Sequence, residues 1–262
     1  IAVLVPNLIN PFFAKLSYYL NIALAASGYQ MLLYSTDYNP QLEQAYIIMA
    51  EQKKVDGIIC LSYNPNLEIS DGVSFVSIDR HFGSYPCVSS DNYGGGRLAA
   101  QKLYENGCKN LAFVRIGSKL TSEPNKRKDG FVSECELLGI PYTLKIVDDE
   151  APYSEFDDFL HENYHDGRLA FDGIFCVTDT LAYQIICYLQ KMGLRVPEDV
   201  QVIGFDGTQH LGNLDLVCST IVQPVEELAK ACVNLVLSQD ASYASSLICL
   251  PTTYAYGGTT LA

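Results

Sequence analysis

Short apolar runs alternate along this chain with longer stretches in which apolar residues recur every three or four positions. An apolar run between turn residues predicts a buried strand, and a spacing of three or four predicts a helix. In the first part of the chain this pattern predicts helices from Asn10 to Gly28 and over 41–53, and strands at 1–5, 31–34, 57–61 and 75–78. Strands that alternate with helices of this length form βαβ units and a parallel sheet.

A second series of the same kind begins near residue 111. Its predicted helices cover residues 125–138, 154–164, 181–192 and 224–237, and its predicted strands cover 111–114, 143–147, 173–177, 200–205 and 219–222. Two consecutive series predict an α/β protein with two similar lobes. Since no low-complexity linker separates them, we expect a hinge of crossovers near Asp91, near Gln223 and at 250–253. The first lobe would comprise residues 1–90 plus 225–250, and the second 91–224 plus 251–262.

Composition narrows the class of protein. A chain of 262 residues with 48% hydrophobic and 18% charged residues can bury a large core. No apolar run reaches the roughly 18 residues of a membrane span, and no basic segment of a signal peptide precedes Ile1. The chain starts inside a predicted strand, so we expect a further segment upstream. Its net charge of −13 repels phosphate backbones, and we do not expect this chain to bind DNA by itself.

The nine cysteines include no CxxC pair and no Cys/His cluster. Most lie in apolar segments, as in Ile59-Cys60-Leu61. We therefore expect buried, reduced thiols in a cytoplasmic protein rather than disulfides. Neither a metal site nor a cofactor is predicted.

Polar and aromatic residues gather where predicted strands end and helices begin. They are Asn10, Phe12, Phe13, Asp79, Arg80, Arg127, Asp179, Asp206 and Gln223. Ligands of open parallel sheets bind beyond the carboxyl ends of the strands, and carboxylates, amides and aromatic faces suit a sugar. Simpler interpretations exist for each residue alone: Asp206 as a turn residue or helix cap, Asp79-Arg80 as a surface ion pair, and one of the adjacent phenylalanines as core.

The glycine cluster Gly94-Gly95-Gly96 between a predicted strand and a predicted helix suggests a dinucleotide-binding loop. Its spacing is not GxGxxG, and no lysine that could hold a phosphate is near. Asp91 as a helix cap, with glycines that allow close helix packing, explains the residues better.

The segment Val196-Pro197-Glu198-Asp199-Val200-Gln201-Val202-Ile203-Gly204-Phe205-Asp206 resembles the VPxDVxVxGFD signature of the LacI family of bacterial sugar-responsive repressors. Further segments resemble motifs of that family in the same order: residues 5–13, 77–80, 90–92, 127–131 and 220–224. Residues 115–118, 125–131 and 77–82 are most similar to the sucrose operon repressors of Gram-positive bacteria.

The resemblance implies two Rossmann-like lobes with parallel sheets joined by a hinge, as in type I periplasmic binding proteins, and a ligand between the lobes. Carried over by motif, the contacts of the first lobe are Asn10, Phe12, Phe13, Ser62, Asp79 and Arg80, and those of the second lobe and hinge are Arg127, Thr178, Asp206 and Gln223. Thr178 stands where relatives often carry Asn or Asp, and Tyr153 offers a further aromatic face. Replacing Arg127 or Asp206 should weaken sugar binding with little change in the fold.

The resemblance therefore implies the effector-binding and dimerisation domain of a repressor of a sucrose, fructose or related carbohydrate operon, and not an enzyme. Operator DNA would be bound through a helix-turn-helix headpiece that this chain does not include. Tyr46, Ile47 and Met49 exceed what one core-facing stripe needs, which favours a homodimer. A sugar receptor of a transport system is the alternative, although nine cysteines and the missing signal sequence disfavour export. No GxSxG, HExxH or P-loop motif suggests catalysis.

Overall fold

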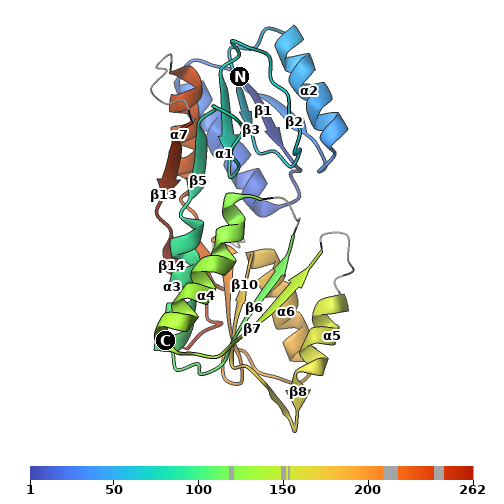
Figure 1. Ribbon diagram of the computed structural model, residues 1–262, viewed down its shortest axis with the longest axis vertical. Helices are drawn as coiled ribbons and strands as arrows, with labels where there is room; N and C mark the ends of the chain where they lie inside the picture. The colour runs from blue at the N-terminus through green and yellow to red at the C-terminus, as the bar shows by residue number, and fades with distance from the viewer. Residues whose placement is uncertain (118–120, 149–151, 153, 209–217, 239–244, 262) are drawn as a thin grey trace. The chain divides into compact units, whose positions relative to one another are not determined.

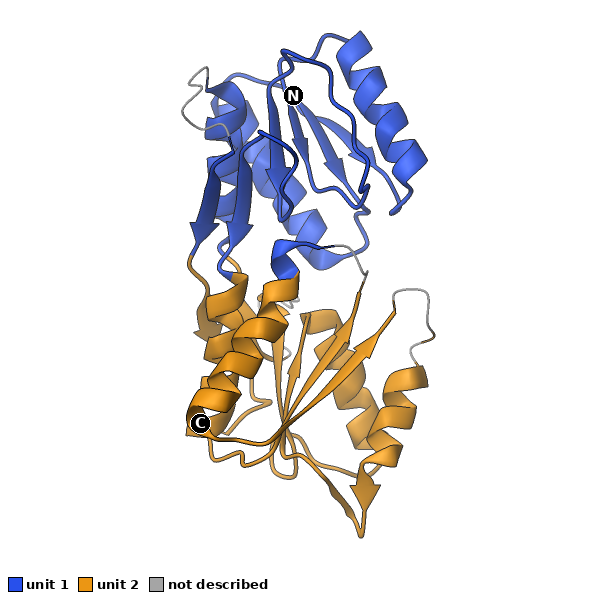
Figure 2. Cartoon of the chain, in the orientation of Figure 1, with its two compact units in different colours: residues 1–91, 120–124, 224–250 blue, residues 92–119, 125–223, 251–262 orange. Residues whose placement is uncertain are grey.

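The computed structural model describes residues 1–117, 121–148, 152, 154–208, 218–238 and 245–261. The chain divides into two compact units, shown in blue and orange in Figure 2. Unit 1 comprises residues 1–91, 120–124 and 224–250, and unit 2 comprises residues 92–119, 125–223 and 251–262.

This division differs from the predicted lobes at residues 91, 120–124 and 224, which the sequence assigns to the second lobe but which belong to unit 1. The segment 120–124 is the largest of these differences. The reason is local hydrogen bonding. The backbone N–H of Glu123 donates to the carbonyl oxygen of Asp79 at 2.9 Å. The Glu123 Oε1 also lies 3.4 Å from the Nε2 of His81.

Unit 1 is built on a parallel six-stranded sheet in the order β13-β5-β4-β3-β1-β2 (Figure 1). Its strands are β1 (Ala2–Val5), β2 (Leu32–Ser35), β3 (Ile58–Cys60), β4 (Phe75–Ile78), β5 (Cys87–Ser90) and β13 (Leu247–Leu250). Its helices are α1 (Pro11–Ala26), α2 (Pro40–Gln52) and α7 (Val225–Leu237).

Alternation along β1 shows which helix covers which face of this sheet. Val3 and Val5 belong to the hydrophobic cluster that α1 and α7 complete, whereas Ala2 and Leu4 belong to the cluster that contains Ile47 of α2. Successive strand residues point to opposite faces, so α2 lies on the face opposite α1 and α7. The strand is buried on both faces, which explains its uninterrupted apolar sequence.

Unit 2 is built on a second six-stranded sheet in the order β14-β12-β11-β10-β6-β7, in which only β14 is antiparallel to its neighbour. Its strands are β6 (Leu111–Ile116), β7 (Tyr142–Val147), β10 (Gly173–Cys176), β11 (Gln201–Asp206), β12 (Ser219–Val222) and β14 (Thr253–Ala255). Its helices are α3 (Asn92–Glu105), α4 (Lys126–Leu138), α5 (Ser154–Glu162) and α6 (Asp179–Lys191), and the turn η1 (Glu123–Asn125) precedes α4.

Two details of unit 2 refine the predicted elements. The predicted helix over residues 154–164 ends at Glu162, and Tyr164 begins a small hairpin of β8 (Tyr164–His165) and β9 (Arg168–Leu169). Along β11, a Cβ at Gly204 would contact α6, whereas Phe205 lies against Gly95 of α3. Helices α6 and α3 therefore cover opposite faces of this sheet.

All nine cysteines are free thiols, and Cys249 is the exposed one. Burial raises the pKa of the Cys60 and Cys176 thiols well above the ordinary value. These thiols are uncharged and unreactive at neutral pH, as the sequence predicts. Within the described residues, no helix is long and apolar enough to cross a membrane.

Helix α2 contains the three residues that favour a homodimer in the sequence, Tyr46, Ile47 and Met49, and the structure differs from that prediction at one of them. Ile47 is fully buried in the core of unit 1, because it lies on the same helix face as Ala50. The apolar side chains that α2 exposes are Ile48 and Met49.

Candidate functional site

Arg127 lies in the first turn of α4, at a close crossing with α3. A Cβ at Gly96 of α3 would collide with the carbonyl oxygen of Arg127, and a Cβ at Gly130 of α4 would collide with that of Tyr93. The two glycines therefore allow the backbones of the helices to touch. This explains the glycine cluster as a packing feature, and it places Arg127 beside Asn92, the first residue of α3.

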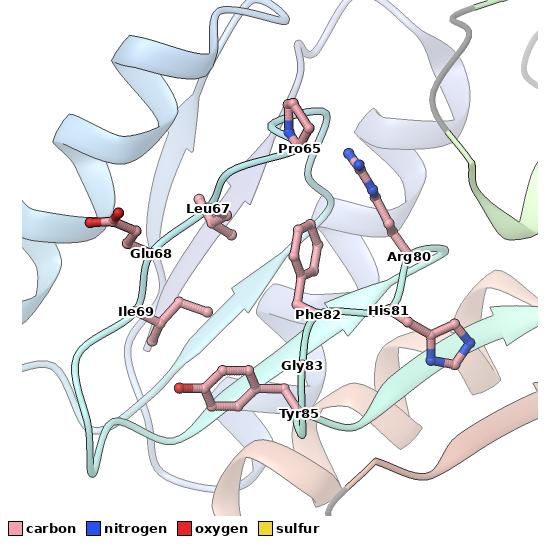
Figure 3. A pocket seen from close by; sticks show the side chains of 9 residues that line it. All are labelled: Pro65, Leu67, Glu68, Ile69, Arg80, His81, Phe82, Gly83 and Tyr85. Carbon is pink, nitrogen blue, oxygen red and sulfur yellow. The ribbon is translucent and has the colours of Figure 1, made fainter.

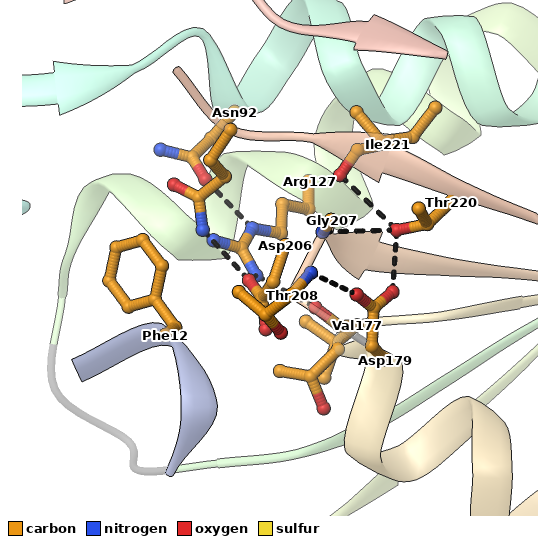
Figure 4. A network of polar contacts seen from close by, with 12 residues as sticks. Phe12, Asn92, Arg127, Val177, Asp179, Asp206, Gly207, Thr208, Thr220 and Ile221 are labelled. Atoms are coloured by element: carbon orange, nitrogen blue, oxygen red, sulfur yellow. Dashed lines mark hydrogen bonds and ion pairs between the residues drawn. The ribbon is translucent and has the colours of Figure 1, made fainter. Parts of the chain in front are cut away.

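The guanidinium of Arg127 is held on several sides (Figure 4). Its Nε donates to Asn92 Oδ1 and its Nη1 to the Val177 carbonyl oxygen, each at 2.7 Å. Its Cζ lies 3.6 Å from the centroid of the Phe205 ring, and its Nη1 lies 3.7 Å from Asp206 Oδ1. With only 4% of the residue exposed, this cation is both fixed in place and balanced by a carboxylate.

Asp206 is the last residue of β11, at the carboxyl end of the sheet. Its φ of 123° lies in the region that residues other than glycine rarely adopt. The Nε2 of Gln223 donates to its Oδ1 at 2.7 Å. Strained backbone of this kind is concentrated at ligand sites, where the surrounding structure holds it. Unit 2 thus brings together three predicted site residues: Arg127, Asp206 and Gln223.

Thr178 is the N-cap of α6 in unit 2, and its Oγ1 accepts the N–H of Leu181 at 3.2 Å. This bond is the ordinary one of a capping threonine, and it leaves the hydroxyl proton for another acceptor. Tyr153 lies outside the described residues.

In unit 1, three of the predicted contacts lie at the start of α1. Asn10 caps the helix, because its Oδ1 accepts the N–H of Phe12 at 2.9 Å, and Pro11 follows as the first helical residue. Phe12 and Phe13 are each 5% exposed, and both belong to the hydrophobic core of unit 1. The adjacency of the two residues predicts one phenylalanine in the core, and the structure buries both.

Ser62 lies just beyond β3 and is buried against Glu43 of α2. The hydroxyl of Ser62 donates to Glu43 Oε1, and the backbone N–H of Tyr63 donates to Glu43 Oε2 at 3.3 Å. Burial raises the pKa of Glu43, although these hydrogen bonds partly oppose the shift. The hydroxyl proton of Ser62 therefore serves a contact inside unit 1.

Asp79 and Arg80 follow β4 at the carboxyl end of the first sheet. Asp79 has a φ of 61°, and its Oδ1 accepts the hydroxyl of Ser89 at 2.6 Å. Burial lowers the pKa of Arg80, and its guanidinium lies 5.2 Å from the centroid of the Phe82 ring. Both units thus end a central strand with an aspartate at positive φ.

A cavity of about 490 Å³ lies beside Arg80, between residues 65–69 and 80–85 of unit 1 (Figure 3). Its wall is mixed, because the apolar side chains Leu67, Ile69, Phe82 and Tyr85 line it together with the polar Glu68, Arg80 and His81. This cavity was not predicted from the sequence. The sequence signal near it is the pair of apolar residues Leu67 and Ile69, which lie between the predicted strands at 57–61 and 75–78. Among the described residues, no group of three His, Cys, Asp or Glu side chains could hold a metal ion.

Comparison with known proteins gives concordant matches. The family model of the periplasmic binding protein-like domain matches residues 100–260. The ribose operon repressor of Halalkalibacterium halodurans is 34% identical over 247 residues, which cover 91% of this chain and 72% of that protein. The sucrose operon repressor of Streptococcus mutans is 29% identical over 245 residues, which cover 91% of this chain and 74% of that protein.

Among solved structures, a periplasmic binding protein/LacI transcriptional regulator from Alkaliphilus metalliredigens, in complex with D-xylulofuranose, aligns with a TM-score of 0.83 at 24% identity. The alignment covers 100% of this chain and 98% of that one. At this identity the likeness establishes the fold.

Proposed function

The chain belongs to the LacI family of regulators with a periplasmic binding protein-like domain, and we propose that this domain senses a small carbohydrate for a transcriptional repressor. The observation that carries the proposal is the group formed by Arg127, Asp206 and Gln223 at the carboxyl end of β11. In an open α/β sheet this end binds ligands. The relatives are named repressors, so we do not assign the chain an enzymatic activity.

We assign the sugar contacts of each unit separately. The two units would be the two lobes of the domain. Unit 1 would contribute Asn10, Phe12, Phe13, Ser62, Asp79 and Arg80, and unit 2 would contribute Arg127, Tyr153, Thr178, Asp206 and Gln223. An ionised carboxylate accepts from two sugar hydroxyls, and a guanidinium donates to neighbouring ones.

The identity of the sugar is a further step. The names of the two relatives contain ribose and sucrose. We propose a pentose, fructose or a fructose-containing disaccharide, or a phosphorylated form of one of these. The ligand would bias the protein between conformations with different affinities for operator DNA.

We further propose a cytoplasmic homodimer that binds its operator through a helix-turn-helix headpiece outside this chain. Apolar side chains of unit 1 are exposed on α2, Ile48 and Met49, and on the sheet-edge strand β2, Leu32 and Leu33, where Leu32 points to the face of the sheet that α2 covers. An exposed apolar face on a sheet edge is where a second copy would reduce the area exposed to water. Sedimentation that shows only monomer at tens of micromolar protein would contradict the dimer.

Calorimetric titration with ribose, fructose, sucrose, xylulose and their phosphates tests the proposal. The parent protein should bind at least one of them. Arg127→Lys and Asp206→Asn should each weaken that binding by roughly 30- to 1000-fold, or about 2–4 kcal/mol, since the first removes the planar guanidinium that donates in two directions and the second removes the charge of the acceptor. Arg195→Lys is the matched control, because Arg195 pairs with Asp199 on the surface. Unchanged affinity in both site variants would exclude the site, and a parent that binds none of the sugars would exclude the ligand class.

A further inference from the structure

Asp179 is a fully buried carboxylate that the proposed ligand contacts do not include. It is the first residue of α6, and it lies directly on β11. A Cβ at Gly204 would collide with Asp179 Oδ1, so glycine at this position makes room for the carboxylate. Gly204 is two residues before Asp206 on the same strand. The carboxylate therefore lies beneath the end of β11 that carries the proposed ligand group.

The carboxylate holds the turn that follows Asp206 (Figure 4). Its Oδ2 accepts the backbone N–H of Thr208 at 3.0 Å, and its Oδ1 accepts the hydroxyl of Thr220 at 2.5 Å. The Thr220 Oγ1 in turn accepts the backbone N–H of Gly207 at 3.3 Å. Both residues after Asp206 are thus tied to Asp179, one directly and one through Thr220.

These bonds act where the backbone is strained. Asp206 has a φ of 123° and Gly207 a φ of 68°. A non-glycine residue keeps such a conformation only where several neighbours enforce it. We propose that Asp179 is a positioning residue, which fixes the backbone of Asp206 so that its carboxylate faces the ligand. This inference rests on the proposed sugar-binding function.

An ionised carboxylate at Asp179 does not contribute to the stability of the fold. Burial raises the pKa of Asp179 to about 6, and hydrogen bonds from Thr220 and Thr208 only partly oppose this shift. A carboxyl with a raised pKa makes the fold less stable when it is ionised. The described titratable groups around it are Cys176 on β10, Cys218 before β12 and Asp206 on β11. Burial raises the pKa of both thiols, so they stay neutral near pH 6.

The test measures the affinity of the parent and three variants for whichever sugar of the panel the parent binds, at about pH 7.5 and about pH 5. Asp179→Asn removes the charge. Thr220→Val removes the hydroxyl that links Asp179 to Gly207 and keeps the size of the side chain. Ser219→Ala is the matched control, since Ser219 is a buried hydroxyl of the same strand that bonds to Thr260.

We expect Asp179→Asn and Thr220→Val to weaken sugar binding at least about ten-fold at the higher pH, while Ser219→Ala binds like the parent. The parent should bind more weakly at the lower pH although protonation of Asp179 itself stabilises the fold there, and Asp179→Asn should show no such pH dependence. If Asp179 only stabilised the fold, the affinity for the sugar and the free energy of unfolding would fall together.

Two results overturn the inference. If the parent binds a sugar and both site variants bind it as the Ser219→Ala control does, Asp179 does not position Asp206, while the proposed function stands. If the sugar affinity of the parent is independent of pH over this range, the ionised form is not required. A parent that binds no sugar refutes the proposed function itself. If circular dichroism shows that Thr220→Val does not fold, Thr220→Ser takes its place; serine keeps the hydroxyl, so this variant must bind the sugar like the parent. The pH dependence of sugar binding by the parent tests the inference without any variant.

Discussion

Replacing Arg127 with lysine should cost stability as well as ligand affinity, which differs from the expectation drawn from sequence. That expectation treats Arg127 as a ligand group whose loss leaves the fold unchanged. The structure instead surrounds the guanidinium with Asn92, Val177, Phe205 and Asp206. Lysine keeps the charge, but it lacks the planar fork that bonds in two directions at once.

The size of the effect follows from these contacts. Each bond of 2.7 Å from the guanidinium has a charged donor and contributes about 1.5–3 kcal/mol. The contact with the Phe205 ring contributes about 1 kcal/mol more. A lysine ammonium can remake one of the two hydrogen bonds and keeps most of its attraction to Asp206. We therefore expect Arg127→Lys to lower the free energy of unfolding by about 2–4 kcal/mol.

Urea unfolding followed by far-ultraviolet circular dichroism measures this loss, because the chain contains no tryptophan for fluorescence. Arg195→Lys is again the control: the side chain of Arg195 is 69% exposed, and an exposed pair contributes about 0–1 kcal/mol. The slope of the free energy against urea should be the same in all three proteins if only stability changes. A loss for Arg127→Lys no larger than the loss for Arg195→Lys would refute the reasoning.

Three further outcomes are expected. Gly130→Ala should destabilise the fold by about 1–3 kcal/mol despite the better helix propensity of alanine, since its methyl group meets the Tyr93 carbonyl. It should also weaken sugar binding, as Arg127→Lys does. Thermal unfolding measures the loss of stability, and calorimetry measures the loss of affinity. The pKa of Asp179 is raised from 3.8 to about 6, so lowering the pH from about 7 to about 5 should stabilise the parent relative to Asp179→Asn by about 1 kcal/mol; urea unfolding at both pH values gives this difference. A thiol reagent should modify the exposed Cys249 first in the native protein, and Cys249→Ser should remove that fast phase.

The fold could be predicted from the sequence because its signals are local. In a parallel sheet the central strands are buried on both faces, so uninterrupted apolar runs such as residues 1–5 identify them. Both α1 and α2 begin with Asn-Pro, in which the asparagine caps the helix and the proline supplies its first residue. The predicted α/β class and the LacI-family membership are confirmed.

The site was less predictable, because its contacts join residues that are distant in sequence. The Arg127–Asn92 hydrogen bond spans 35 residues, and it depends on the crossing of α3 and α4 at Gly96 and Gly130. The glycine cluster predicts close helix packing, but the sequence does not indicate which helix packs there. Ser62 shows the same limit, since only the fold reveals that its hydroxyl bonds to Glu43.

Asp79 and Asp206 share both a position in the sequence, directly after an apolar strand segment, and a positive backbone φ. Each is an aspartate at the carboxyl end of a central parallel strand, and each has a positive φ, in two different sheets. Glycine adopts positive φ without strain, and aspartate tolerates a φ near 60° at little cost, as Asp79, Asp37 and Asp166 do here. Asp206 is different, because a non-glycine residue at a φ of 123° costs about 1–3 kcal/mol and persists only where its neighbours enforce it. Neighbouring hydroxyl and amide groups, Ser89 for Asp79 and Gln223 for Asp206, orient both carboxylates. The strain at Asp206 and the orientation of both carboxylates are the structural basis of the proposal that these two acids bind a hydroxyl-rich ligand.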